Sequence, residues 1–151
     1  MLRIAAEPFY DPEGAALRAE MEAEMVERYG DDLEPGVKPS AADVAVFLVA
    51  RDERRAAVGC GALRRLDEET FEIKRMYVRP AAREQGVGRE LLGALEDEAR
   101  RLGATCMRIE TGPAQPEAIQ LYKRAGYVAI PCWGAYAELA GTLCFERALA
   151  G

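Results

Sequence analysis

Residues 71–89 read FEIKRMYVRPAAREQGVGR, and this stretch decides the fold because it joins a strand to a helix through a loop with two glycines. The aromatic and β-branched residues of 71–79 are typical of a strand. From Gly86 to Leu102 apolar side chains recur along one stripe, which predicts a helix with one buried face. Glycines let the backbone approach a ligand, and the N–H groups at the start of a helix attract negative charge. The unit is therefore expected to bind an anionic group such as a pyrophosphate.

Three phosphate-binding patterns could apply to the loop, and only one of them fits its residues. A Walker A loop requires Gly-Lys-Ser or Gly-Lys-Thr, which the chain lacks, and the dinucleotide fingerprint requires a third glycine where Leu91 stands. The pattern Arg-x-x-Gly-x-Gly is met by Arg83, Gly86 and Gly88. Six residues alone do not separate a pyrophosphate site from a helix that simply begins with convenient glycines.

The rest of the chain adds strands on both sides of this unit and predicts one domain over residues 1–151. Strands are expected at 2–6, 44–51, 56–66, 71–79, 105–110, 127–130 and 142–147, and helices at 13–29, 86–102 and between Pro116 and Gly126. Loops are expected over 30–43 and, as a mobile segment, over 132–142. This order of strands and helices predicts a mixed α/β (α+β) sheet.

Composition excludes several classes of function. The 151-residue chain has 20 basic and 26 acidic residues and no histidine, which excludes a Ser-His-Asp triad, a histidine general base and a histidine-liganded zinc site. We expect no metal. The longest apolar run, 44–50, is too short for a membrane span, and the N-terminus has no signal-peptide core. A basic stretch at 74–89 in an acidic protein suits a small anion better than nucleic acid.

The cysteines indicate a reducing environment. Cys60, Cys106, Cys132 and Cys144 lie far apart and form no C-x-x-C pair. We expect all four to pack as small apolar residues rather than to form a disulfide or hold a metal. Free thiols and the lack of an export signal predict a cytoplasmic protein.

A second motif identifies the family that the chain resembles. Residues 115–127 read QPEAIQLYKRAGY, which resembles the pattern Asn-x-x-Ala-x-x-Leu-Tyr-x-x-x-Gly-Phe/Tyr of the GNAT N-acetyltransferase superfamily. The loop at 83–88, with MYVRP (76–80) before it, resembles the acetyl-CoA site of the same family. The resemblance implies a largely antiparallel central sheet with two splayed parallel strands, flanked by helices, and acetyl-CoA as co-substrate.

The resemblance also implies which residues would bind acetyl-CoA. The pantetheine arm would lie between the diverging strands 71–79 and 105–110, and an N–H near Met76 or Tyr77 would polarise the thioester carbonyl. Backbone amides of the loop would bind the pyrophosphate, assisted by the side chains of Arg83 and Arg89. The cofactor-binding residues implied in this way are Met76, Tyr77, Val78, Arg83, Glu84, Gln85, Gly86, Val87, Gly88, Arg89 and Gln115. Gln115 stands where the family usually has asparagine.

Three residues are candidates for proton transfer. The resemblance makes Tyr122 the general acid that protonates the leaving thiolate of CoA, and its spacing from Gln115 and Ala118 puts all three on one helix face. Without histidine, a carboxylate or a water chain must act as the base. Glu72 is the first candidate, because it shares a strand face with Met76 if no bulge intervenes, and Glu110 is the second.

These features predict direct transfer of acetyl from acetyl-CoA to the primary amine of a small molecule in a ternary complex. No acetyl-cysteine is expected, because no cysteine lies beside a plausible base. Two alternatives stay open: an acyl-CoA-binding sensor without activity, and an N-acyltransferase that uses another acyl-CoA. The C-terminal strand at 142–149 is a candidate homodimer interface, and Trp133, Tyr136, Tyr10 and Tyr29 are candidates to line the acceptor pocket.

Overall fold

The computed structural model describes residues 2–30 and 43–149, so most of the loop expected at 30–43 lies outside the described residues. The strands are β1 (Arg3–Ala6), β2 (Val46–Arg51), β3 (Ala57–Arg65), β4 (Thr70–Val78), β5 (Cys106–Thr111), β6 (Val128–Ile130) and β7 (Leu143–Ala148). The helices are α1 (Pro12–Tyr29), α2 (Val87–Arg101) and α3 (Pro116–Arg124), with short 3-10 helices η1 (Pro80–Ala82) and η2 (Gly134–Glu138). Every strand and helix expected from the sequence is present. The expected loop at 132–142 instead contains η2.

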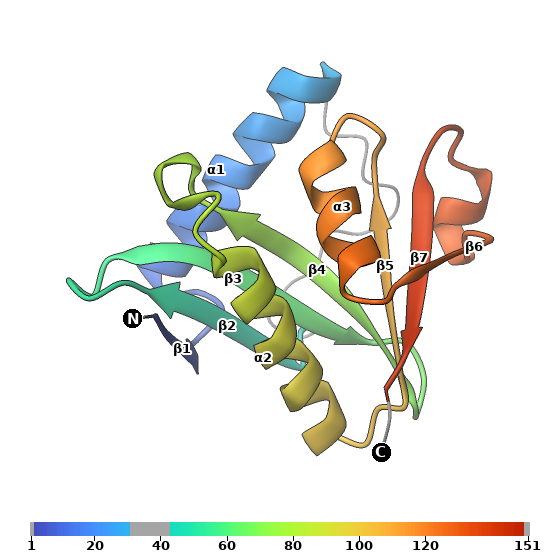
Figure 1. The fold of residues 1–151 in the computed structure, drawn as a ribbon, viewed down its shortest axis with the longest axis horizontal. Helices are drawn as coiled ribbons and strands as arrows, with labels where there is room; N and C mark the ends of the chain where they lie inside the picture. The colour runs from blue at the N-terminus through green and yellow to red at the C-terminus, as the bar shows by residue number, and fades with distance from the viewer. Residues whose placement is uncertain (1, 31–42, 150–151) are drawn as a thin grey trace.

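The seven strands form one mixed sheet in the order β1-β2-β3-β4-β5-β7-β6 (Figure 1). Neighbouring strands run antiparallel except β4 and β5, which are parallel. A parallel pair requires a crossover connection, and α2 provides it. The predicted fold class, a largely antiparallel sheet with one parallel pair flanked by helices, is confirmed.

Helices cover both faces of the sheet (Figure 1). α2 and α3 lie on one face, where Leu91 and Leu95 pack with Phe71 in the larger core. α1 lies on the other face, where Leu17 packs against Phe47. Burial of each such side chain stabilises the fold by about 1.5–3 kcal/mol. No helix within the described ranges is long and apolar enough to cross a membrane.

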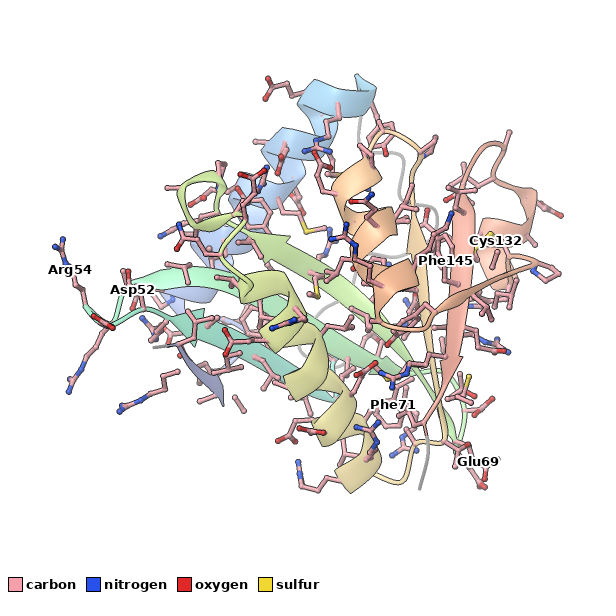
Figure 2. All side chains as sticks on the ribbon, in the orientation of Figure 1. Asp52, Arg54, Glu69, Phe71, Cys132 and Phe145 are labelled. Carbon is pink, nitrogen blue, oxygen red and sulfur yellow. A yellow bond between two sulfur atoms is a disulfide. The ribbon has the colours of Figure 1, made fainter. Side chains whose placement is uncertain are left out.

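The two strand connections of the meander are turns built on aspartate side chains. Asp52 Oδ1 accepts hydrogen bonds from the N–H groups of Arg54 and Ala56 at 2.9 and 3.0 Å, and Asp67 Oδ1 accepts from Glu69 and Thr70 at 2.9 and 2.7 Å. Figure 2 shows the tips of these turns, at Asp52 and Arg54 and at Glu69, on different sides of the molecule. Such turns fix the register of β2, β3 and β4.

β4 and β5 separate within the sheet. Three residue pairs join them, the last being Glu72 with Arg108, and the described strands form no further pair beyond it. In Figure 1 the two strands run together near the β3–β4 turn and then diverge. The main-chain edge of β4 is thereby opened toward β5, as the family resemblance implies.

A β-bulge lies in β4 where the strands diverge. Cys60 of β3 pairs with Tyr77 and Ala62 pairs with Lys74, so two residues of β4, Arg75 and Met76, lie opposite one residue of β3. Arg75 has a φ of 55°, in the left-handed region. Because the bulge changes the alternation of side chains, Met76 packs into the α2-side core with Phe71 and Ile73. Glu72 alternates with those two residues and faces the other side, so the expectation that it shares a face with Met76 is wrong.

The cysteine prediction is also wrong for two of the four residues. Cys132 and Cys144 form a disulfide across twelve positions of sequence, whereas Cys60 and Cys106 are free. The sequence gives no sign of this pair, because it depends on how β6, η2 and β7 fold together; Figure 2 shows Cys132 beside β7 and Phe145. Two of the four cysteines therefore no longer support the argument for a reducing compartment.

Counting thiols tests the disulfide. Protein unfolded without reductant is expected to react with two equivalents of a chromogenic disulfide reagent (DTNB), and reduced unfolded protein with four. In the folded protein Cys60 should not react, because it is fully buried and burial raises the pKa of its thiol to about 12. Four equivalents from unreduced, unfolded protein would show that the bond does not form.

Candidate active site

A cavity of about 280 Å³ opens where β4 and β5 diverge. Its walls come from the second half of α1, the middle of β4, the end of β5, the first turns of α3 and the segment before β7. The lining residues are 21, 22, 25, 29, 73–76, 109–113, 115, 118, 122 and 139–142. Because α1 and α3 cover opposite faces of the sheet, the cavity passes through the sheet at the gap between the strands.

Tyr122 forms the α3 wall of the cavity. Its side chain is buried, and its ring packs edge-on against Tyr127 with 5.8 Å between ring centroids. Within the described part of the chain its hydroxyl makes no hydrogen bond. Burial raises the pKa of Tyr122 well above its usual value, so the hydroxyl keeps its proton at neutral pH. A protonated hydroxyl at a cavity wall is available to a ligand.

Gln115 and Ala118 line the same wall as Tyr122. Their spacing along α3 explains this, since residues three and seven positions apart lie on one side of a helix. The helix begins with Pro116 in its first turn, and Gly126 follows its end with a φ of 93°. The short helix therefore brings Gln115, Ala118 and Tyr122 to the same cavity.

The two candidate bases lie in different environments. Glu110, at the end of β5, lines the cavity and accepts a hydrogen bond from the Thr142 hydroxyl. Glu72 is 1% exposed and does not line the cavity. Its Oε2 accepts a hydrogen bond from the Tyr136 hydroxyl at 2.7 Å. The structure therefore brings Glu110, and not Glu72, into the space that Tyr122 faces.

Glu72 belongs to a buried network that also includes Lys74 and Tyr136. Lys74 Nζ donates to the Tyr136 hydroxyl at 2.7 Å and lies 3.9 Å from Glu72 Oε2. All three side chains are buried. The network fixes η2 against β4, which places the pocket-lining residues 139–142 that follow it. The sequence makes Tyr136 a candidate to line the pocket. In the structure it does not line the cavity but binds Glu72 and Lys74 behind the cavity wall.

The loop before α2 has the geometry expected of an anion site. Glu84 and Gly86 have φ values of 64° and 82°, and Glu90 donates the first main-chain hydrogen bond of the helix to Gly86. The N–H groups of the preceding residues, Val87 to Arg89, therefore have no acceptor inside the helix. A Cβ on Gly88 would lie 3.3 Å from Leu121 Cδ2, so the loop adjoins α3 and the cavity wall.

The other residues implied as cofactor-binding are distributed around this loop. Met76 lines the cavity, whereas Tyr77 packs on the α1 side of the sheet. Arg83 donates to the Val78 carbonyl oxygen at 2.9 Å and to Glu24 of α1 at 2.7 Å, and this guanidinium lowers the pKa of Glu24. Gln85 and Arg89 are exposed. The side chain of Arg83 thus ties the loop to α1, while that of Arg89 is open to solvent.

Sequence reasoning missed most of the α1 wall. Met21, Met25 and Tyr29 recur every four residues, which indicates a buried helix face, and the structure places that face partly in the cavity. Tyr29 accepts a hydrogen bond from the Ala114 N–H at 3.1 Å, and Arg28 donates to the Ala114 carbonyl oxygen at 2.8 Å. These bonds hold the end of α1 to the β5–α3 loop. Tyr10 is 71% exposed and does not line the cavity.

The raised pKa of Tyr122 predicts a loss of stability in alkali. In the unfolded chain a tyrosine ionises near pH 10, whereas folded Tyr122 stays protonated above that pH. The folded state then binds more protons, so the free energy of unfolding falls by about 1.4 kcal/mol per pH unit above pH 10 for this residue. The free energy of unfolding can be measured with denaturant at several pH values between 9 and 11.5. It should fall less steeply with pH for Tyr122→Phe than for the wild type. Parallel curves would contradict the buried environment of this hydroxyl.

A model of a known protein family matches most of the chain. A family model described as Acetyltransferase (GNAT) family matches residues 5–127. These residues run from β1 to the end of the α3 motif and include both the loop before α2 and Tyr122.

The individual proteins that are similar to this chain also include acetyltransferases and an acyltransferase. An IAA acetyltransferase of Azospirillum brasilense is 37% identical over 134 residues, which cover 83% of this chain and 87% of that protein. A candidate acyl-CoA N-acyltransferase from Klebsiella pneumoniae superposes with a TM-score of 0.86 at 34% identity over 99% of each chain. A GNAT family acetyltransferase from Elizabethkingia anophelis, solved with acetyl-CoA bound, shares the fold with a TM-score of 0.72 at 20% identity over 98% of each chain.

Proposed function

The chain belongs to the GNAT acetyltransferase family, and from this membership we propose that it transfers the acetyl group of acetyl-CoA to the amine of a small molecule by direct attack. Acetyl-CoA supplies an activated acyl group as a thioester. The remaining chemistry is to bind that thioester, to remove a proton from the attacking amine and to return one to the departing sulfur.

The observation that carries the proposal is Tyr122, a buried residue that lines the cavity between β4 and β5 and whose hydroxyl makes no hydrogen bond in the described part of the chain. A thiolate that leaves without a proton is a poor leaving group in a buried site, because burial disfavours the charged form. Tyr122 would donate its proton to the sulfur as the carbon–sulfur bond breaks. Its hydroxyl is then reprotonated from solvent or from the base.

The binding residues fit a pyrophosphate followed by an extended arm. The glycine loop and the N–H groups of Val87, Gly88 and Arg89 would receive the phosphates, and Arg89 is the arginine there whose side chain is open to solvent. The arm would follow the opened edge of β4, and the bulge at Arg75 and Met76 would direct an N–H toward the thioester oxygen. Gln115 would contact the arm from α3.

Glu110 is the proposed base. It lines the cavity on the β5 side, whereas Glu72 is buried behind the wall. An ammonium group must lose a proton before its nitrogen can attack the acetyl carbon, and the carboxylate of Glu110 would take that proton directly or through water. All four cysteines lie in the described ranges and none of them lines the cavity, which favours direct transfer over an acetyl-cysteine intermediate.

Initial-rate kinetics combined with intact-protein mass spectrometry test the proposal. Direct transfer predicts intersecting double-reciprocal lines when acetyl-CoA and amine are varied together, and an unchanged protein mass after incubation with acetyl-CoA alone. Parallel lines with a stable acetyl adduct on the protein would overturn direct transfer. Acetyl-CoA binding without any turnover would instead support a sensor, and faster turnover with a longer acyl-CoA would change the assigned donor.

A further inference from the structure

Resting on the proposed function, in which Glu110 is the base, we propose that Thr142 is a positioning residue for that base. The Thr142 hydroxyl holds the carboxylate of Glu110 in the orientation from which the carboxylate takes a proton from the acceptor amine. Thr142 neither exchanges a proton with the amine nor binds the acetyl group, so it acts on the rate only through Glu110.

The contact between the two side chains is the first observation. The Thr142 hydroxyl donates a hydrogen bond to Oε2 of Glu110, and both residues line the cavity. The main-chain carbonyl oxygen of Thr111, at 3.4 Å from the same hydroxyl, is the more distant acceptor. A hydroxyl has one proton to donate, so this proton is directed to the nearer acceptor, Glu110. Both side chains belong to half-buried residues, which places the bond at the cavity wall.

The register of β5 against β7 explains why the two side chains meet. Glu110 lies directly opposite Cys144, so their side chains are on the same face of the sheet. Thr142 precedes Cys144 by two residues, which makes it the diagonal neighbour of Glu110. Gly141, with a φ of 81°, turns the chain into β7 just before Thr142. The pairing of the strands therefore brings the hydroxyl within reach of the carboxylate.

The segment that carries Thr142 is held at both ends, which is the second observation. Two residues after Thr142, Cys144 is joined to Cys132 by the disulfide. Before Thr142, η2 is fixed by the Tyr136 hydroxyl, which belongs to the buried network behind the cavity wall. The hydroxyl of Thr142 is thus in place before the acceptor arrives. A group that is placed in advance costs no reorganisation during the reaction.

A donated hydrogen bond can help a carboxylate base in two ways. It fixes the orientation of the carboxylate, and rates depend steeply on such placement, since a displacement of about 1 Å can cost about 10²-fold. It also favours the charged form of a carboxylate, which is the form that accepts a proton. Thr142 would provide both effects for Glu110.

Two substitutions of Thr142 test this role. Thr142→Val removes the hydroxyl and nearly keeps the shape of the side chain, whereas Thr142→Ser keeps the hydroxyl. The turnover number is measured as amine-dependent thiol release from acetyl-CoA, with isopentylamine, leucinamide, leucine and spermidine as acceptors. Thr142→Val is expected to lower kcat by about 10-fold, the lower end of the contribution of a hydrogen bond to a charged group. Thr142→Ser should retain most of the wild-type kcat.

The double variant distinguishes positioning from a structural role. In Glu110→Gln the base is absent, so adding Thr142→Val should cause no further loss of kcat. In the wild-type background, the loss caused by Thr142→Val should shrink at high pH, where the amine is already a free base. A merely structural role of Thr142 would lower kcat by the same factor in both backgrounds and at every pH.

Thr70→Val is the matched control. Thr70 is buried at the β3–β4 turn, where its side chain hydrogen-bonds to the carboxylate of Asp67, and it does not line the cavity. The substitution therefore removes a hydroxyl-to-carboxylate bond of the same kind at a distant place, and kcat should be unchanged. The acetyl-CoA affinity and the unfolding midpoint of each variant show whether it is folded.

The outcomes separate this inference from the proposed function. A wild-type kcat in Thr142→Val, or the same loss in both backgrounds, would overturn the role of Thr142 while amine acetylation stands. A wild-type kcat in Glu110→Gln would overturn the base and its positioning together and leave acetylation intact. Thiol release with none of the four amines would overturn the proposed function and this inference with it.

Discussion

Replacing Tyr122 with phenylalanine is expected to lower kcat by about 10²–10⁴-fold, the usual contribution of a positioned general acid. The affinity for acetyl-CoA should stay the same, because only one oxygen atom is removed from a cavity wall. Stability should also be preserved, since the hydroxyl makes no hydrogen bond in the described part of the chain and the ring keeps its contact with Tyr127. Steady-state kinetics and calorimetric titration of acetyl-CoA measure the two effects separately.

Tyr127→Phe provides the matched control. The Tyr127 hydroxyl donates to the buried carboxylate of Glu96 at 2.9 Å and does not line the cavity. Its removal should cost roughly 1–2 kcal/mol of stability. The turnover number should be unchanged. If Tyr122→Phe retained wild-type kcat, Tyr122 would be only a packing residue, and the assignment of the general acid would be wrong.

Replacing Glu110 with glutamine is expected to lower kcat by about 10²-fold near neutral pH, because the acceptor amine then loses its proton to solvent alone. The amide can still accept the hydrogen bond from Thr142, so this contact with the segment before β7 is kept. The deficit should shrink as the pH rises above the pKa of the acceptor amine, near 8 for an α-amino group, since more of the amine is then free base. A pH–rate profile of both proteins from pH 6 to 10 measures this convergence.

Glu72→Gln should lower the stability of the protein and leave most of its rate. Glu72 compensates the buried charge of Lys74 and holds Tyr136, so its neutralisation should cost about 3 kcal/mol of stability. Most of kcat should remain, measured where the variant is folded. A large loss of rate in Glu72→Gln, with a wild-type rate in Glu110→Gln, would show that Glu72 is the base and acts through Tyr136.

Much of the fold could be predicted from local pattern. The apolar stripe of α2 and the Pro116 and Gly126 boundaries of α3 depend on neighbouring residues, and each is found where expected. The spacing of Gln115, Ala118 and Tyr122 likewise follows from helix geometry alone. The family resemblance added the separation of β4 from β5, which periodicity does not reveal.

The parts that could not be predicted depend on contacts between distant segments. The bulge at Arg75 results from the register of β4 against β3, and nothing in the residue types of β4 requires it. Because of that one extra residue, the side chains after the bulge point to the opposite faces from those that strict alternation would give. Glu72 and Met76 therefore lie on different faces of the sheet. The disulfide of Cys132 with Cys144, and the burial of Tyr136 against Lys74, similarly require η2 to fold back on the sheet.

The most direct test of amine acetylation is the stoichiometry of thiol release against acetylated product. Wild-type protein is incubated with acetyl-CoA and an amine panel, free CoA thiol is titrated, and the N-acetyl product is quantified by mass spectrometry with a protein-free blank. Direct transfer predicts thiol release that depends on the amine and equals the N-acetyl product mole for mole. Thiol release that is independent of the amine, or an acetyl group found on no amine, would contradict it.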